Sequence, residues 1–238
     1  MKLTAELILV FFILGCEKGT INGMNKIDTL KIETPADQLS YLALGDSYTI
    51  GEAVAQDQSF PYQLAVKLNT QGVKVAVPRI IAKTGWTTGE LQAAVQSASI
   101  TRKFDVVTLL IGVNNQYRGN SIELYRTEFR SLLQTAIAFA SGNKAHVFVV
   151  SIPDWGVTPF GKGSGKEVKS ISKEIDAFNA VNKEETLQAG VSYTDITPES
   201  RDVANDVSLA AADGLHPSGK MYQEWVTLLA PAIVKAFK

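Results

Sequence analysis

One serine and one aspartate–histidine pair are the residues of this chain best suited by type and spacing to catalyse a reaction. Ser47 lies in Gly-Asp-Ser-Tyr at 45–48, directly after a short apolar run, and Asp213 precedes His216 by three residues. A serine hydroxyl becomes a competent nucleophile when a base removes its proton, and a carboxylate that fixes the tautomer of a histidine makes that histidine an effective base. A tight turn at Gly214 would place the Asp213 carboxylate on Nδ1–H of His216 and leave Nε2 facing Ser47.

The pattern of apolar residues predicts the elements that must position these side chains. From residue 39 onward, short apolar runs alternate with longer amphipathic segments, which is typical of βα units and a parallel sheet. Near-continuous apolar character predicts five strands buried on both faces, at 41–44, 73–81, 106–111, 146–152 and 191–194. Helices are predicted near 61–69, 88–97, 122–140, 168–189 and 217–237, with Pro61 and Pro217 in first turns. No linker divides residues 39–238, so we expect one α/β domain.

Polar turns follow the first three predicted strands. The first strand leads to Ser47, the second to Lys-Thr-Gly-Trp at 83–86, and the third to Gly-Val-Asn-Asn at 112–115. In an open parallel sheet, ligands bind at the carboxyl ends of the strands, where the strand order reverses. A strand order of 2-1-3-4-5 would therefore place Ser47 and Asn114 across one crevice.

The order and spacing of these motifs resemble those of the SGNH hydrolases, also called the GDSL esterase/lipase family, across about residues 39–238. The resemblance implies a three-layer α/β/α, flavodoxin-like fold with a five-stranded parallel sheet. It also implies a catalytic triad of Ser47, Asp213 and His216, which acts on carboxylic esters without a metal or other cofactor.

The same resemblance implies an oxyanion hole formed by the backbone N–H groups of Ser47 and Gly85 and by the side-chain amide of Asn114. Glycine at 85 is explained by a close approach of the backbone to the ligand, or equally by a turn that needs a positive φ. Asn115 stands where the family usually has aspartate, which puts the local support of Asn114 in question.

Three aromatic residues in the loops of the catalytic edge are candidates for lining the substrate pocket. They are Trp86, Tyr117 and Trp155, and aromatic residues in such loops also simply pack.

Other titratable residues near the predicted strand ends could have structural roles or replace Asp213 in the triad. We interpret Asp46 as structural support, and Asp154 and Asp195 as second-choice triad carboxylates. His146 opens the fourth strand at the opposite edge of the sheet, which favours a structural role.

Composition excludes several classes of function. The 238 residues carry 23 basic and 24 acidic side chains, so no basic field is available for a nucleic-acid backbone. One cysteine and two histidines exclude a disulfide framework within the chain and a structural zinc site that needs several thiolates.

The N-terminus predicts export and a lipid anchor. Residues 7–14 form an apolar run too short to span a bilayer but long enough for a signal-peptide core. Ile-Leu-Gly-Cys at 13–16 resembles a bacterial lipobox, so we expect residues 1–16 to be a signal with lipidation at Cys16, 17–38 to be a tether, and 39–238 to be the hydrolase domain. The protein would then be an exported lipoprotein of the periplasm or cell surface. Ordinary secretion and a buried N-terminal helix are the alternatives.

These observations together predict a serine esterase that works through an acyl-enzyme. Several stretches resemble a bacterial, lysophospholipase-like subgroup of the family, which favours lysophospholipids or short-chain acyl esters as substrates. Removal of O-acetyl groups from carbohydrates is the alternative reaction, and a non-catalytic binding lipoprotein of the cell surface is the alternative of another class. The sequence does not predict an oligomeric state.

Overall fold

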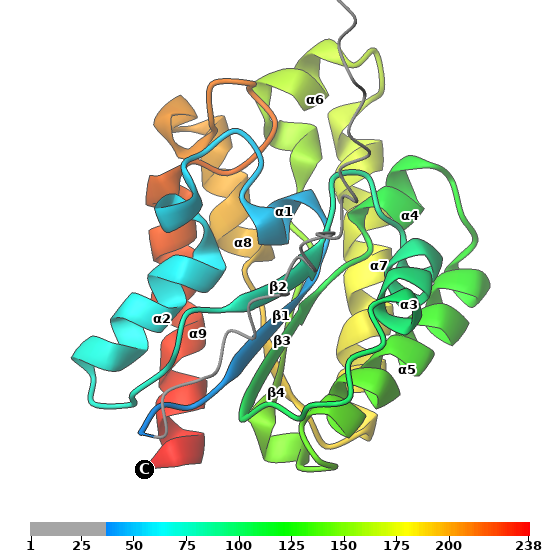
Figure 1. Ribbon diagram of the computed structural model, residues 1–238. Helices are drawn as coiled ribbons and strands as arrows, with labels where there is room; N and C mark the ends of the chain where they lie inside the picture. The colour runs from blue at the N-terminus through cyan, green and yellow to red at the C-terminus, as the bar shows by residue number, and fades with distance from the viewer. Residues whose placement is uncertain (1–36) are drawn as a thin grey trace, which may run out of the picture. The chain divides into compact units, whose positions relative to one another are not determined.

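The computed structural model describes residues 37–238, and its central sheet has five parallel strands in the order β2-β1-β3-β4-β5 (Figure 1). This is the order that brings the turns after β1 and β3 to the point where the strand order reverses. The strands are β1 (Tyr41–Gly45), β2 (Arg79–Ala82), β3 (Val106–Leu110), β4 (Val147–Val150) and β5 (Ser192–Thr194). The predicted signal, Cys16 and most of the predicted tether lie outside the described residues.

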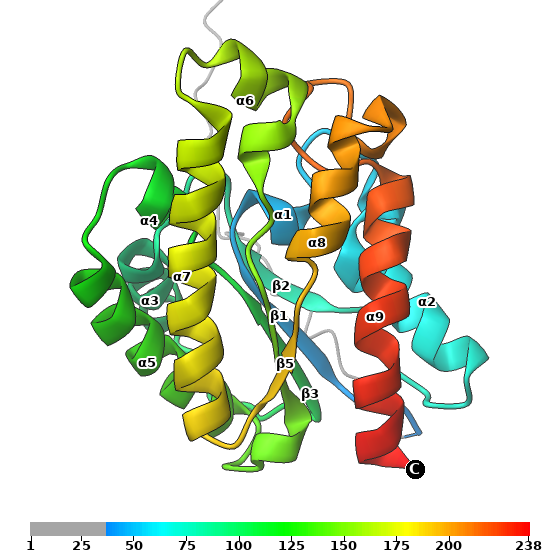
Figure 2. The same ribbon diagram turned by 180° about the vertical axis from the view of Figure 1, so that it is seen from behind.

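Helices cover both faces of this sheet. Figures 1 and 2 show α3 (Thr88–Ser97), α5 (Ile122–Phe139) and α7 (Val168–Gln188) on one face, and α2 (Phe60–Thr70) and α9 (Gly219–Phe237) on the other. The three-layer fold that the sequence predicts is therefore confirmed.

Shorter helices lie in the turns between these elements. The short α-helices are α1 (Ser47–Ile50), α4 (Val113–Tyr117), α6 (Pro159–Gly163) and α8 (Thr197–Ser200). The 3-10 turns are η1 (Gln56–Gln58), η2 (Lys144–His146), η3 (Trp155–Val157), η4 (Arg201–Ala204) and η5 (Val207–Leu209). Figure 1 shows α1, α4 and α6 toward the same end of the molecule, opposite the C-terminus.

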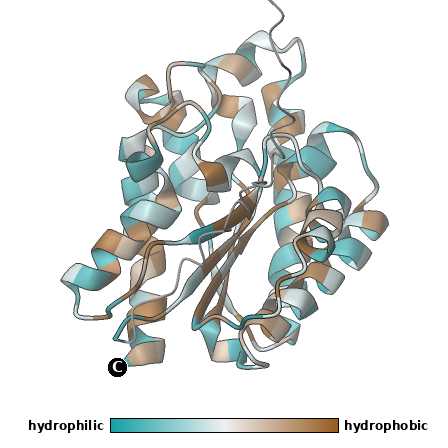
Figure 3. Cartoon of the chain, viewed as in Figure 1, coloured by the Kyte–Doolittle hydropathy of each residue, from teal (hydrophilic) through white to brown (hydrophobic). Residues whose placement is uncertain are grey.

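Burial of the sheet differs between its centre and its edges. All residues of β1, β3 and β4 are buried, and Figure 3 shows the hydrophobic colouring concentrated along these central strands. The edge strands β2 and β5 are only partly buried, so the prediction that all five strands are buried on both faces was wrong for these two. An edge strand has a neighbour on one side only, which leaves it less covered.

The second strand is shorter than the sequence predicts. It begins at Arg79, and the preceding segment contributes only an isolated bridge between Val75 and Leu39. Pro78 stands between the two parts, and a proline has no N–H to donate to a strand ladder. Val73 and Val75 are buried, which explains why these positions are apolar. Their apolar character predicted a strand, although most of that segment is not in the sheet.

The last helix also begins later than predicted. Pro217 pairs with Ala210 in an isolated bridge, and the helix starts at Gly219 with Ser218 as its N-cap. The Ser218 hydroxyl accepts a hydrogen bond from the backbone N–H of Met221. A serine cap satisfies a first-turn N–H, and that is a stronger start signal than proline alone. The helices predicted at 88–97, 122–140 and 168–189 agree with α3, α5 and α7 to within one residue.

None of the helices in residues 37–238 is both long and apolar enough to cross a membrane.

A buried carboxylate fastens α5 to α7. The side chain of Glu185 is 4% exposed and accepts hydrogen bonds from Arg126 Nη1 at 2.6 Å and from Arg130 Nε at 2.7 Å. The Arg130 and Arg126 guanidinium groups hold the pKa of Glu185 below its usual value, against the opposing effect of burial. Glu184, its neighbour, forms an ion pair with Arg126, accepts from Gln188 Nε2 at 3.1 Å and is 49% exposed.

We expect Glu185→Ala to lower the free energy of unfolding by about 2–3 kcal/mol, because charge-assisted bonds to a buried group are lost. Glu184→Ala is the matched control and should cost less than about 0.5 kcal/mol, as exposed ion pairs do. Urea denaturation of both variants measures the difference. Equal losses would contradict the assigned role of Glu185.

Candidate active site

The turn after β1 presents Ser47 at the first position of α1. Asp46 is the N-cap of this short helix, and its Oδ1 accepts a hydrogen bond from Tyr48 N–H at 3.0 Å. A Cβ at Gly45 would overlap the Thr49 side chain and the Leu110 carbonyl, so only glycine fits at this position. Ser47 itself is 5% exposed, which leaves a small accessible face at the carboxyl edge of the sheet.

Asp213 and His216 form the pair that their spacing predicts. Nδ1 of His216 lies 2.6 Å from Oδ2 of Asp213, and Oδ1 accepts the backbone N–H groups of Leu215 and His216 at 2.9 and 3.0 Å. Partial burial opposes ionisation of Asp213, but the bonds from His216 and Leu215 outweigh it and hold its pKa below the usual value. The carboxylate is therefore charged at neutral pH and fixes the histidine ring.

The His216 ring packs against the residue that follows the serine. The ring centroids of Tyr48 and His216 are 5.5 Å apart, and the rings are tilted by 58°. Tyr48 also packs edge-on against Trp225 of α9, and this second contact helps to fix the position of the Tyr48 ring. This contact, which the sequence did not indicate, brings the Asp213–His216 turn to the Ser47 turn across about 170 residues of chain.

The three groups expected to donate to a negatively charged oxygen each have a hydrogen without an acceptor in the described part of the chain. The side-chain amide of Asn114 gives one hydrogen to the Trp86 carbonyl at 3.0 Å, and an amide nitrogen carries two. The N–H groups of Ser47 and Gly85 have no hydrogen-bond acceptor among residues 37–238. Three donors of the kind that an oxyanion hole requires are therefore uncommitted in the described part of the chain.

Backbone conformation explains the glycine at 85. Its φ is +85°, which side chains rarely adopt, whereas a Cβ would meet only Arg118 Nη2 at 3.6 Å. The positive φ is therefore the requirement at this position, rather than lack of space. Arg118 donates to the Gly85 carbonyl and so holds the turn from its other side.

Asn115 supports the turn that carries Asn114, although the family usually has aspartate there. It is fully buried; its Oδ1 accepts from Thr88 N–H at 3.0 Å and its Nδ2 donates to Thr88 Oγ1 at 2.8 Å. An asparagine can donate and accept at once, which an ionised aspartate cannot. The substitution therefore keeps α4 fastened to the start of α3.

The chain enters this turn through Gly112, which has φ +136°. A Cβ here would lie 2.6 Å from the Tyr125 hydroxyl, which donates to the Ile111 carbonyl at 3.1 Å. The buried Tyr125 on α5 thus fixes the path of the backbone from β3 to Asn114.

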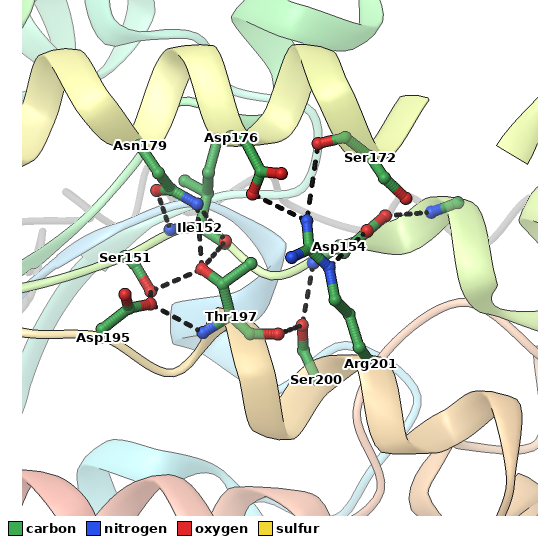
Figure 4. Close-up of polar contacts among 11 residues, drawn as sticks. Ser151, Ile152, Asp154, Ser172, Asp176, Asn179, Asp195, Thr197, Ser200 and Arg201 are labelled. Atoms are coloured by element: carbon green, nitrogen blue, oxygen red, sulfur yellow. Dashed lines mark hydrogen bonds and ion pairs between the residues drawn. The ribbon is translucent and has the colours of Figure 1, made fainter. Parts of the chain in front are cut away.

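The two second-choice carboxylates serve other partners. Asp154 is buried and accepts from Arg201 Nε at 2.9 Å and from Gly156 N–H at 2.9 Å (Figure 4). Asp195 Oδ1 accepts from Ser151 Oγ and Thr197 N–H, both at 3.1 Å (Figure 4). These bonds hold the loops after β4 and β5 together, and neither carboxylate bonds to a histidine within the described residues.

His146 packs on Phe237, near the C-terminus, with ring centroids 4.4 Å apart. It lies at the amino end of β4, at the opposite edge of the sheet from Ser47. No three His, Cys, Asp or Glu side chains of residues 37–238 converge on a position that could hold a metal ion.

The three aromatic candidates occupy different positions. Trp86 is half-buried against the core, and its carbonyl holds Asn114. Trp155 is 2% exposed, and its Nε1–H donates to Gln116 Oε1 at 2.8 Å. It therefore packs beneath the surface and offers almost no area to a substrate. Tyr117 is 48% exposed and stands edge-on over Trp155, while Phe160, which the sequence analysis missed, is 40% exposed beside it.

One family model matches most of the chain. Residues 43–224 match the model of the GDSL-like Lipase/Acylhydrolase family. No protein of curated function matches the sequence significantly.

Three solved structures illustrate the likeness of fold. TesA has a TM-score of 0.63 at 18% identity, covering 83% of this chain and 99% of its own. The psychrotrophic esterase EstA from Pseudoalteromonas sp., in a structure inhibited by monoethylphosphonate, has a TM-score of 0.63 at 17% identity, covering 84% and 99%. An acetylxylan esterase from Geobacillus stearothermophilus has a TM-score of 0.58 at 18% identity, covering 83% and 93%. At these identities the likeness is one of fold.

Asp46 combines full burial with an incomplete set of partners. Its Oδ2 has no hydrogen-bond partner among the described residues, while Oδ1 caps α1. Burial raises the pKa of Asp46 to about 7, against the opposing effect of the bond from Tyr48 N–H. The native state therefore holds this proton more tightly than the unfolded chain does.

A raised pKa gives stability that is complete at low pH and is lost as the pH rises through about 7. Asp46→Asn cannot ionise and keeps an oxygen for the Tyr48 bond. We expect the unfolding free energy of the natural protein to fall relative to this variant between pH ~4 and pH ~8, by roughly 4 kcal/mol at most. Urea denaturation across this range measures the difference, and parallel curves for the two proteins would contradict the prediction.

Proposed function

Because the chain belongs to the GDSL-like lipase/acylhydrolase family, whose members are serine esterases, we propose that Ser47, His216 and Asp213 form its catalytic triad. The observation that carries this proposal is the 2.6 Å contact between Asp213 and a histidine whose ring packs on the residue next to Ser47. A histidine oriented in this way has Nε2 available as a base beside a serine.

Acylation begins when Ser47 Oγ attacks the ester carbonyl carbon and its proton passes to Nε2 of His216. The imidazolium that forms is stabilised by the ionised Asp213. Collapse of the tetrahedral intermediate breaks the bond to the alcohol oxygen, which takes the proton from His216 as it leaves. Water then attacks the acyl-enzyme, with His216 accepting its proton. Collapse of the second intermediate breaks the bond to Ser47 Oγ, which takes that proton back from His216, and the carboxylic acid is released.

The donors around this position act on the carbonyl oxygen. Negative charge develops on that oxygen in both tetrahedral intermediates, and fixed donors stabilise it more strongly than they stabilise the neutral ester. Ser47 N–H, Gly85 N–H and the second hydrogen of the Asn114 amide are the groups we assign to this role. The turns of Ser47 and Asn114 are held by buried hydrogen bonds, so little reorganisation of these two turns accompanies the reaction.

The proposed substrates are acyl esters, either lysophospholipids or short-chain esters. The lysophospholipase-like motifs of the sequence support the first of these, and the exposed side chains of Tyr117 and Phe160 provide apolar surface for part of such a substrate. The second candidate, a carbohydrate O-acetyl ester, is supported by the fold shared with an acetylxylan esterase.

We further propose that the protein is exported and anchored by lipid at Cys16. The apolar run at 7–14 and the lipobox-like sequence at 13–16 support this proposal. Such an anchor would keep the hydrolase beside a membrane.

A fluorophosphonate probe tests the activated serine without a guess about substrate. We expect covalent labelling of the purified protein at Ser47, located by peptide mass, and none in Ser47→Ala. Well-folded protein that gives no adduct would reject the triad and favour a non-catalytic binding lipoprotein.

Asn114 and Asn115 are adjacent residues with different expected effects. Asn114→Ala removes an oxyanion donor and should lower kcat by about 10²–10³-fold with little change in stability. Asn115→Ala removes buried hydrogen bonds and should lower the unfolding free energy by roughly 1–3 kcal/mol. Steady-state kinetics and urea denaturation on both variants separate the effects. A kcat for Asn114→Ala close to that of the natural protein would remove this residue from the oxyanion hole.

A further inference from the structure

A lysine lies over two aromatic rings at the catalytic edge. Nζ of Lys166 is 5.2 Å from the ring centroid of Tyr117 and 5.8 Å from that of Trp155. Phe160 packs against Trp155 with ring centroids 6.1 Å apart. We call these four residues, Tyr117, Trp155, Phe160 and Lys166, the α4–α6 platform.

The platform connects two parts of the proposed catalytic machinery. Tyr117 lies on α4, one turn after Asn114. At its other end, Phe160 N–H donates to the Gly214 carbonyl at 2.9 Å, and Gly214 stands between Asp213 and His216. The platform is therefore joined to the turn of Asn114 by α4 and to the Asp213–His216 turn by a hydrogen bond.

Lys166 has no carboxylate partner among residues 37–238, and its recorded ammonium contacts are the two ring faces. Lys74 and Lys220, in contrast, are each paired with an aspartate. The segment at 159–169 carries three lysines and one glutamate, and Glu174 and Asp176 follow on α7, where they bond to Gln116 and Arg201. Lys166 is therefore an ammonium group that lies on the rings without a carboxylate of its own among the described residues.

The exposed rings add a second property to this surface. Tyr117 and Phe160 are 48% and 40% exposed, although aromatic rings of this size are usually more covered. An ammonium group beside open aromatic faces suits a ligand with an anionic group next to an apolar part.

We propose that the α4–α6 platform binds a phosphate group carried by the ester substrate, with Lys166 as the residue that recognises it. This inference rests on the proposed esterase function and names a substrate class for the same site. The Lys166 ammonium pairs with the phosphate oxygens as a point charge, and the rings of Tyr117 and Phe160 contact the apolar carbons beside it. A neutral ester makes the second contact without the first.

Two soluble esters that differ only in the phosphate test the inference. These are 1-butyrylglycerol 3-phosphate and monobutyrin, whose short chains keep them monomeric, so no lipid surface contributes. The measured quantity is the ratio of kcat/KM for the phosphate ester to kcat/KM for the neutral ester. We expect the natural protein to favour the phosphate ester, and Lys166→Ala to lower the ratio about tenfold, as loss of a hydrogen bond to a charged group does.

Two further variants separate recognition from general charge. Lys166→Arg keeps the charge and should keep most of the ratio. Lys169→Ala removes the same charge from an exposed position nearby that has no recorded contact with the rings, and should leave the ratio unchanged. Raising the salt concentration should lower the ratio in the natural protein, because exposed charges are screened.

The possible failures are distinguishable. Equal kcat/KM values for the two esters in the natural protein, or a ratio that persists in Lys166→Ala, would overturn the phosphate inference while the esterase activity stands. If neither ester is hydrolysed and the fluorophosphonate probe leaves Ser47 unlabelled, the proposed function fails and this inference fails with it.

Discussion

Parallel pairing of the five strands is the constraint on which the site depends. It sends every strand-to-helix turn to one edge of the sheet, and the order β2-β1-β3 makes the chain leave β1 and β3 toward opposite faces. Ser47 and Asn114 come from those two turns, and Gly85 comes from the turn after β2. The Asp213–His216 pair does not lie in a turn that follows a strand. Its histidine ring packs on Tyr48 of α1, and Tyr48 in turn packs edge-on against Trp225 of α9.

The strongest features of this arrangement were predictable from the sequence. Long buried strands and helices of ten residues or more have a repeated pattern, and a hydrogen bond between residues three apart, such as Asp213 and His216, needs only a local turn. Pro78 and Ser218 also carried local signals, the missing N–H and the capping hydroxyl, that would have corrected the limits of β2 and α9.

Other features had no readable signal. The short helices α1, α4 and α6 contain four or five residues, too few for a helical period to show. The contact of Tyr48 with His216 joins distant parts of the chain, and the exposure of Phe160 depends on how α6 sits against the turn at Gly214. Whether Gly85 was required by space or by conformation also depended on a φ angle, which the residue type alone does not give.

The side chain of Gln116 joins three parts of the structure through a single amide. Its oxygen accepts from Trp155 Nε1–H at 2.8 Å and its nitrogen donates to Glu174 at 2.6 Å, so only one orientation of the amide satisfies both neighbours. Trp155, α4 and α7 are thereby locked into one rigid body, and α4 carries Tyr117 on the same short helix as Asn114. A substrate that fits against Tyr117 is therefore aligned with the Asn114 amide on the same fixed helix. Discrimination among substrates would then be expressed in turnover more than in affinity, because the surface that contacts the substrate and the group that stabilises the transition state keep a constant spacing.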